Sequence, residues 1–374
     1  MSDRMVPQAS GPTLKADFEG KVRQVRELFA DDASVGGVLF ESQANYSWLT
    51  GGRGFVGFAS EDSCASVLVT RDKAYVLTNR IEAGRIKDEE TEGLEGSVEF
   101  VCSEWHTPSQ KGRQIDEIIG GKALRREGDY AARIMAVRSR LTELGLRRAE
   151  WLCAESAAVT EDACRSLRPG VSELELAGTL SSALWSKGIC PVVTLIAFDD
   201  RIRKYRHPIP TENRLAKQAM VVMCARRWGL VISLTRLTHF GPIDADLRRR
   251  HAAVATVDAR MIAASKPGAP TSDVQKVNRD SYAELGFDGE WRLHHQGGMA
   301  GYSAREYVTG DEGSHVIGAG EMFAWNPSIT GTKSEDTILI REGGNKVLTH
   351  TGGYGYLDVE AGGAAIPRPD ILIL

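Results

Sequence analysis

The chain has 374 residues, enough for two or three domains, and its 46 Lys and Arg side chains against 50 Asp and Glu give a formal net charge of −4. Nucleic-acid binding calls for a clustered basic surplus, so this balance argues against a nucleic-acid partner. The best apolar stretch, residues 220–234, is interrupted by Arg226 and Arg227 and is too short to span a membrane.

Two features indicate a cytoplasmic protein. The first 20 residues contain no apolar segment of the kind found in a signal peptide. The six cysteines are scattered, with no CxxC pair, which is typical of free thiols in a reducing compartment.

Helix and strand alternate in the N-terminal part. Apolar residues at helical spacing predict helices over 18–29 and 130–146. Residues 41–45 are typical of a turn. Short β-rich runs predict strands at 37–40, 65–70, 74–78 and 98–101.

The C-terminal part begins with helices and continues with strands. Helices are predicted at 149–167, 172–187, 245–264 and 271–285, and strands at 192–197, 220–224, 230–234, 321–325, 337–341 and 345–349. Ser172 and Glu175 form the sequence pattern of a capping box, which marks a helix start. We place the domain boundary at the end of the helix over 130–146, giving domains 1–146 and 147–374.

One glycine-rich segment, residues 52–57, matches the GxGxxG pattern of dinucleotide-binding proteins. That fingerprint requires a helix after the glycines, whereas strands are predicted here. We therefore interpret the segment as a turn and expect no cofactor.

Several motifs come in an order typical of one family. They are NYSWLTG at 45–51, RPGVSE at 168–173, RHPIPT at 206–211, SLTR at 233–236, HQGGMAG at 295–301 and SEDTIL at 334–339. This order resembles the creatinase/prolidase (M24) superfamily. The resemblance implies an α/β N-terminal domain and an α+β pita-bread C-terminal domain, a pseudo-twofold curved antiparallel sheet covered by helices. It also implies a homodimer in which one subunit's N-terminal domain lies near the other's site.

The peptidases of this superfamily bind two divalent metals through two Asp, one His and two Glu. The matching positions here are Cys224 (or Val222), Ser233, Gly298, Asn326 and Glu335. A single carboxylate does not provide the hard oxygen ligands of a two-metal site. The departures therefore predict no metal site and argue against a metal-dependent aminopeptidase or prolidase.

The superfamily also holds metal-free members such as creatinase and ectoine hydrolase, and by resemblance to creatinase His207 is the general base and acid. A neutral imidazole can take a proton from water and return it to a leaving nitrogen. Glu335 is expected to pair with a cationic group, and Asn326 to orient water or an amide. The alternative for His207 is a structural role in holding its loop.

The substrate-binding candidates are mostly cationic or aromatic. Arg305 and Arg53 are expected to hold a substrate carboxylate, although Arg305 could instead form an ion pair within the protein. Ser233 is expected to orient a polar group. The remaining candidates for the cavity wall are His295, Tyr302, Trp228 and Trp325, for which core packing is the alternative.

These residues lead to the hypothesis of a metal-independent hydrolase that cleaves a non-peptide C–N bond in a small carboxylate-bearing substrate. A guanidino acid, a cyclic amidine or an amide would fit. The alternatives are a lyase, isomerase or cyclase on the same scaffold, and a binding protein without catalytic activity.

Overall fold

The computed structural model describes residues 5–7 and 10–374. Residues 1–4 and 8–9, part of the segment expected to carry no signal peptide, lie outside the described residues. The chain divides into two compact units. The N-terminal unit is Met1–Arg148 with Trp228–Leu230, and the C-terminal unit is Ala149–Arg227 with Val231–Leu374.

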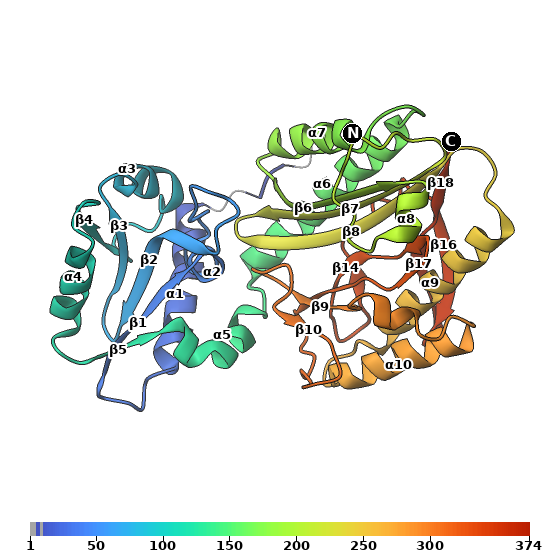
Figure 1. Ribbon diagram of the computed structural model, residues 1–374. Helices are drawn as coiled ribbons and strands as arrows, with labels where there is room; N and C mark the ends of the chain where they lie inside the picture. Colours follow the sequence, from blue (N-terminus) through green and yellow to red (C-terminus); the bar gives the residue numbers. More distant parts are fainter. Residues whose placement is uncertain (1–4, 8–9) are drawn as a thin grey trace. The chain divides into compact units, whose positions relative to one another are not determined.

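The N-terminal unit is an α/β layer structure (Figure 1). Its elements are α1 (Gly11–Glu27), β1 (Val35–Ser42), α2 (Gln43–Thr50), β2 (Asp62–Thr70), β3 (Ala74–Asn79), α3 (Ala83–Arg85), a π-helical turn (Ile86–Glu90), β4 (Glu99–Ser103), α4 (Ser109–Ile119), β5 (Ala123–Arg126), a 3₁₀ turn (Glu127–Tyr130) and α5 (Ala131–Arg138). The sheet order is β4-β3-β2-β1-β5. Strand residues Leu39, Leu68 and Leu77 pack against Ile115 and Ile119 of α4. The alternating apolar residues of the strands thus bury one sheet face under a helix.

Two segments differ from the sequence prediction. Of the turn predicted at 41–45, residues 41–42 end β1 and residues 43–45 begin helix α2. The helix forms because Ser42 accepts a hydrogen bond from Asn45 N–H at its start and Gly51 ends it with φ 73°. The helix predicted over 130–146 is interrupted after Arg138. The next helix has a new start, where the Thr142 hydroxyl accepts from Gly145 N–H at 3.1 Å.

The C-terminal unit contains most of the strands. Its elements are α6 (Glu143–Ser166), α7 (Glu173–Trp185), β6 (Cys190–Phe198), α8 (Asp200–Lys204), β7 (Gln218–Arg227), β8 (Leu230–His239), α9 (Ala245–Ala264), α10 (Thr271–Glu284), a 3₁₀ turn (Glu290–Leu293), β9 (Gly297–Ala300), β10 (Tyr307–Val308), β11 (Met322–Trp325), β12 (Ser328–Ile329), β13 (Thr332–Lys333), β14 (Asp336–Leu339), β15 (Lys346–Val347), β16 (Tyr356–Ala361), β17 (Ala364–Pro369) and β18 (Ile371–Ile373). The main sheets have the orders β18-β8-β7-β6 and β10-β9-β11-β14-β15.

Helices cover these sheets (Figure 1). Helix α7 packs on β6, and α9 packs on α10 and on β13, β16 and β17. Thr235 N–H of β8 donates to the carbonyl of Glu335 at 3.0 Å, which brings β8 beside the start of β14. The arrangement is the mixed helix and sheet unit expected for the C-terminal part.

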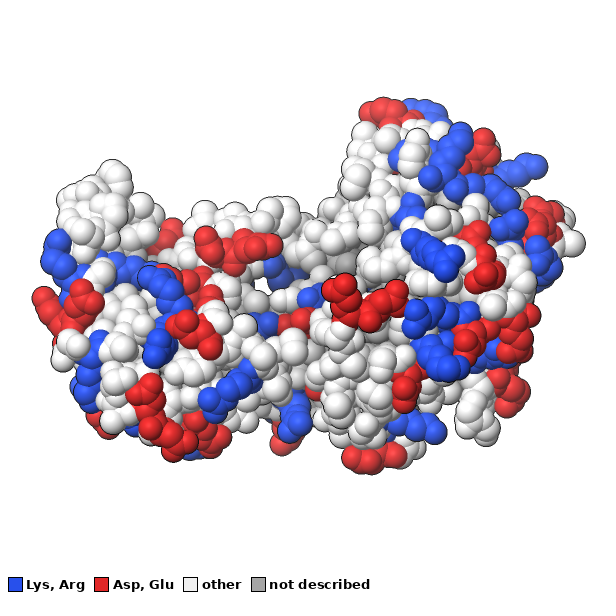
Figure 2. Space-filling model, turned by 60° about the horizontal axis from the view of Figure 1, so that its bottom comes forward, with Lys and Arg blue, Asp and Glu red and all other residues white. Residues whose placement is uncertain are grey.

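On the face shown in Figure 2, acidic and basic side chains are interspersed, and the face as a whole does not carry charge of a single sign. Within residues 5–7 and 10–374, no helix is both long and apolar enough to cross a membrane.

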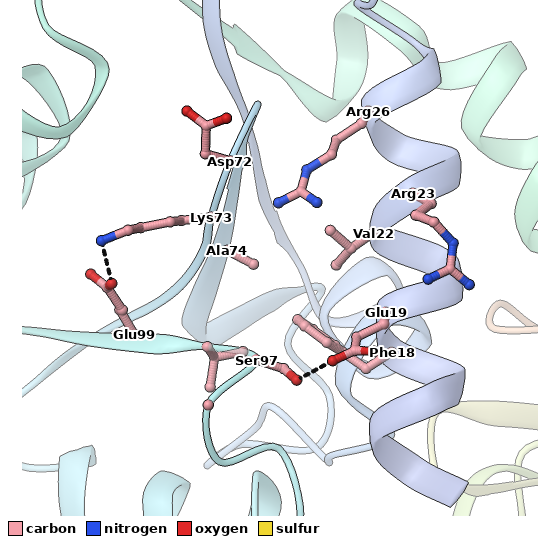
Figure 3. A pocket seen from close by; sticks show the side chains of 12 residues that line it. Phe18, Glu19, Val22, Arg23, Arg26, Asp72, Lys73, Ala74, Ser97 and Glu99 are labelled. Atoms are coloured by element: carbon pink, nitrogen blue, oxygen red, sulfur yellow. Dashed lines mark hydrogen bonds and ion pairs between the residues drawn. The ribbon is translucent and has the colours of Figure 1, made fainter. Parts of the chain in front are cut away.

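One pocket of about 430 Å³ lies in the N-terminal unit, between α1 and the segments around β3 and β4. Its charged lining residues are Glu19, Arg23, Arg26, Asp72, Lys73 and Glu99. Lys73 Nζ lies 2.6 Å from Glu99 Oε1, and Ser97 Oγ donates to Glu19 Oε1 at 2.7 Å (Figure 3). Acidic and basic groups balance here, so the pocket offers no net charge to an ionic ligand.

A buried charge network lies in the core of the C-terminal unit. Arg236 Nε donates to Glu161 Oε1 at 3.1 Å, and its Nη1 donates to Asp336 Oδ1 at 3.0 Å. Arg368 Nη2 lies 2.5 Å from Asp336 Oδ2 and 2.7 Å from Asp258 Oδ2. Burial raises the pKa of Asp336, but Arg236 and Arg368 outweigh this and hold the pKa well below its ordinary value. The network links α6, β8, α9, β14 and β17.

Replacing Arg236 by Met should destabilise the C-terminal unit by about 3–5 kcal/mol, because it leaves buried carboxylates without their cation. The exposed pair of Arg214 and Glu175 provides the control, and Arg214→Met should cost less than about 1 kcal/mol. Urea-induced unfolding measures both changes. Equal, small changes would contradict this role of Arg236.

Candidate functional site

The candidate site includes neighbouring residues of β7 and β8. Cys224 Sγ lies 3.2 Å from Ser233 Oγ, and both side chains are buried. Ser233 Oγ also accepts a hydrogen bond from Arg305 Nη1 at 3.1 Å. Burial raises the pKa of the Cys224 thiol, and Glu335 adds to the rise, so this thiol is protonated at neutral pH.

Glu335 is enclosed by hydrogen-bond donors. Lys333 Nζ lies 2.9 Å from Oε2, and Arg305 Nη2 lies 3.2 Å from Oε1. Thr235 Oγ1 donates to Oε2 at 2.7 Å. Burial raises the pKa of Glu335, but Lys333 and Arg305 more than compensate and lower it below its ordinary value. Glu335 is therefore ionised, and both of its oxygens are occupied by protein groups.

Three imidazoles form a second group, which we call the histidine cluster: His207, His294 and His295. The Nε2 atoms of His207 and His294 are 3.0 Å apart. The rings of His294 and His295 are stacked with their centroids 4.4 Å apart. His294 is buried, whereas the other two are exposed.

Polar contacts fix the two segments that carry this cluster. Arg206, next to His207, has Nη2 2.5 Å from Glu290 Oε2 in the 3₁₀ turn before His294. Gln296 Nε2 donates to the carbonyl of His294 at 2.6 Å, and Tyr282 O–H donates to Gln296 Oε1 at 3.0 Å. The histidines thus lie on anchored backbone rather than on free loops.

The cluster is neutral at pH 7. Burial lowers the pKa of His207, and the charge of Lys333 lowers it further. Burial, with Lys333 next in importance, lowers the pKa of His294 to about 2. Burial and the charge of Arg305 lower the pKa of His295 to about 4. Each ring therefore has a nitrogen lone pair that can accept a proton or bind a metal ion.

The five positions that match the two-metal site of peptidases do not fit such a site. Glu335 is the one carboxylate among them, and it is bound to Lys333 and Arg305. At Gly298, which pairs with Val308 between β9 and β10, an added Cβ would lie only 2.0 Å from the Tyr307 carbonyl oxygen. No side chain fits there without a change of the strand pairing.

The fifth of these positions, Asn326, carries an amide where a second carboxylate would be needed. Its Oδ1 is buried without a hydrogen-bond partner in the part of the chain that the structure describes. A neutral acceptor of this kind can orient a water or a substrate N–H, but it does not replace the charge of a carboxylate.

The other predicted site residues are distributed over both units. Tyr302 is buried after β9, and its N–H donates to Glu306 Oε1 at 2.8 Å. Trp325 is fully buried on β11, and its indole N–H donates to Ser265 Oγ at 2.9 Å, so it packs in the core. Arg53 and Trp228 belong to the N-terminal unit. Arg53 pairs there with Glu89 at 2.7 Å.

Sequence reasoning missed two residues of the site, Lys333 and His294. Lys333 lies two residues before Glu335, and side chains two apart in extended chain point to the same face, so this spacing was the available signal. His294 was missed because neighbouring residues on regular extended chain point apart, and its neighbour His295 was the one assigned to the site.

Comparison with known proteins identifies the family to which this architecture belongs. Residues 149–342 match the metallopeptidase family M24. The chain belongs to this family. Curated relatives in the comparison are an uncharacterized peptidase of Staphylococcus saprophyticus, 24% identical over 257 residues (65% of this chain, 71% of that protein), and one of Staphylococcus aureus, 26% identical over 197 residues (49% and 55%).

Solved structures of M24 proteins confirm the predicted pita-bread fold. An Xaa-Pro dipeptidase from Bacillus anthracis has a TM-score of 0.73 at 18% identity and covers 96% of this chain and 100% of that one. The prolidase from Pyrococcus horikoshii has a TM-score of 0.71 at 20% identity and covers 89% and 98%.

These relatives overturn the functional hypothesis drawn from the sequence. The hypothesis of a creatinase-like enzyme for a non-peptide C–N bond was wrong, as was the exclusion of a peptidase, because the M24 relatives are named as peptidases, prolidases and dipeptidases. The names of these relatives give no support to the lyase, isomerase and cyclase alternatives. The error lay in inferring a change of substrate from a change of ligands.

Replacing Glu335 by Gln should destabilise the protein by about 3 kcal/mol at pH 7, because Lys333 and Arg305 would then be buried beside a neutral amide. Because the pKa of Glu335 is lowered on folding, its stabilisation is present above the ordinary value of 4.5 and is lost as the pH falls below it. The difference between wild type and E335Q should therefore shrink in acid, as measured by urea unfolding at several pH values. The exposed Glu360→Gln should show no such trend.

Proposed function

We propose that this protein hydrolyses peptide bonds in short peptides within the C-terminal unit. The observation that carries the proposal is the neutral histidine cluster beside the buried charges of Lys333, Arg305 and Glu335. Membership of the M24 family and the peptidase names of the relatives support the choice of a peptide as substrate. The proposed reaction does not use the two-metal site of other peptidases, because the residues present at the matching positions do not fit one.

The histidine cluster supplies the attacking water. A neutral imidazole draws a proton from water, the oxygen attacks the peptide carbonyl carbon, and the C–N bond breaks. The proton passes to the leaving nitrogen, so that one water is added across the bond. We assign activation of the water to His207, an exposed member of the cluster that adjoins His294.

The charges next to the cluster favour a peptide with a free carboxylate. Lys333 and Arg305 bring two positive charges, of which Glu335 neutralises one. Arg305 Nε is buried without a hydrogen-bond partner among the described residues. A peptide carboxylate can balance the remaining charge and take the guanidinium's free donor, which favours cleavage near the C-terminus of a short peptide.

A panel of dipeptides and tripeptides tests this function. Wild-type protein should release amino acids from peptides with a free carboxylate, and C-terminal amidation should lower kcat/KM by about tenfold to a hundredfold, because a charge-assisted contact is lost. Mass spectrometry of the products measures the cleavage.

Two histidine variants provide the comparison. His207→Ala should lower kcat by about 10²–10⁴-fold. His106→Ala, an exposed histidine of the N-terminal unit, should leave it unchanged. Failure of wild type to cleave any peptide, or equal turnover by His207→Ala, would refute the proposal.

A further inference from the structure

The histidine cluster has the dimensions of a metal site. One ring nitrogen from each of His207, His294 and His295 lies within 4.8 Å of the other two. A tetrahedral ion with metal–nitrogen bonds of about 2.0–2.1 Å needs its ligand nitrogens about 3.3 Å apart. The 3.0 Å between the Nε2 atoms of His207 and His294 is close to this spacing. Because no two of the three nitrogens are more than 4.8 Å apart, the largest separation must shrink by at most about 1.5 Å for all three to reach one ion.

We propose that His207, His294 and His295 bind one transition-metal ion through three imidazole nitrogens, with a fourth position left for water or substrate. The inference rests on the proposed peptidase function and changes the role of His207, whose lone pair binds the ion instead of taking the proton of water directly. It also departs from the sequence analysis, which predicted no metal site. Three nitrogen ligands without a carboxylate favour Zn²⁺ or a similar ion over Mg²⁺ or Ca²⁺.

His294 gives independent support. Its side chain is more than nine-tenths buried, and its Nδ1 has no hydrogen-bond partner in the described parts of the chain. A buried polar nitrogen without a partner is costly. Coordination through Nδ1, with the ring turned so that this atom takes the place of Nε2, gives this nitrogen a partner that the described chain does not supply.

The backbone around the cluster is already held in place. The ion pair of Arg206 with Glu290 joins the loop of His207 to the turn before His294. The contacts of Gln296 with the His294 carbonyl and with Tyr282 fix the second segment. Outer contacts of this kind orient metal ligands and reduce the entropy lost on binding.

The surrounding charges determine which kind of ligand is favoured in the open fourth position. Arg206 is neutralised by Glu290, and Glu335 neutralises one of Lys333 and Arg305, so one positive charge remains. A dication among three neutral ligands beside a surplus positive charge favours an anion in its open position. Hydroxide, the attacking form of water, and a carboxylate both meet this requirement.

Metal binding by the full-length chain tests the inference without an activity assay. Protein stripped with a chelator is titrated with Co²⁺ and with Zn²⁺, and binding is followed by the visible absorption of tetrahedral Co²⁺ and by elemental analysis. Wild type should bind one ion per chain. His207→Ala and His295→Ala, both at exposed positions, should each weaken binding at least tenfold, and His106→Ala should not.

Two further variants distinguish the cluster from the usual two-metal position. Cys224→Ala and Ser233→Ala should bind the ion like wild type. The proposal is overturned by absence of binding, by more than one ion per chain, or by loss of binding in these two variants but not in the histidine variants. Peptide cleavage by the stripped protein would support the proposed peptidase function and refute only the role of the metal ion in it.

Discussion

The ion pairs of Asp336 with Arg236 and Arg368 connect the core of the C-terminal unit to its site. Asp336 faces inward to the two arginines, and Ser334 Oγ donates to Asp258 Oδ2 at 2.6 Å. Lys333 and Glu335 contact each other on the opposite face. Because successive residues of extended chain point to opposite faces, one short segment supplies charges both to the core network and to the candidate site.

This arrangement explains why the candidate site differs from a carboxylate-lined metal cage. Cations occupy the space next to Glu335, where a two-metal site would need further acidic ligands. The neutral imidazoles lie on a separate pair of anchored segments. The residues capable of proton transfer or metal binding are therefore His207, His294 and His295, and not the five positions that match the two-metal site of peptidases.

Much of the fold could be predicted from sequence because it follows from local patterns. The capping box of Ser172 and Glu175 is present, with Ser172 N–H donating to Glu175 Oε2 at 2.7 Å and Glu175 N–H donating to Ser172 Oγ at 3.1 Å. The candidate site was harder to predict from the sequence. The approach of His207 to His294 and that of Arg305 to Glu335 depend on tertiary contacts between segments 87 and 30 residues apart. Trp325 lies in the core, which is the alternative that the sequence analysis gave for it.

The pairing of Gly298 with Val308 makes the change from the family's two-metal site difficult to reverse. Substituting carboxylates at Cys224, Ser233 and Asn326 would restore chemical types, but the Tyr307 carbonyl would still occupy the place of the missing imidazole. Restoring a two-metal site would require a new register between β9 and β10 as well as several side-chain substitutions. The divergence of this chain within its family is thus recorded in its backbone, where stepwise point mutation cannot easily undo it.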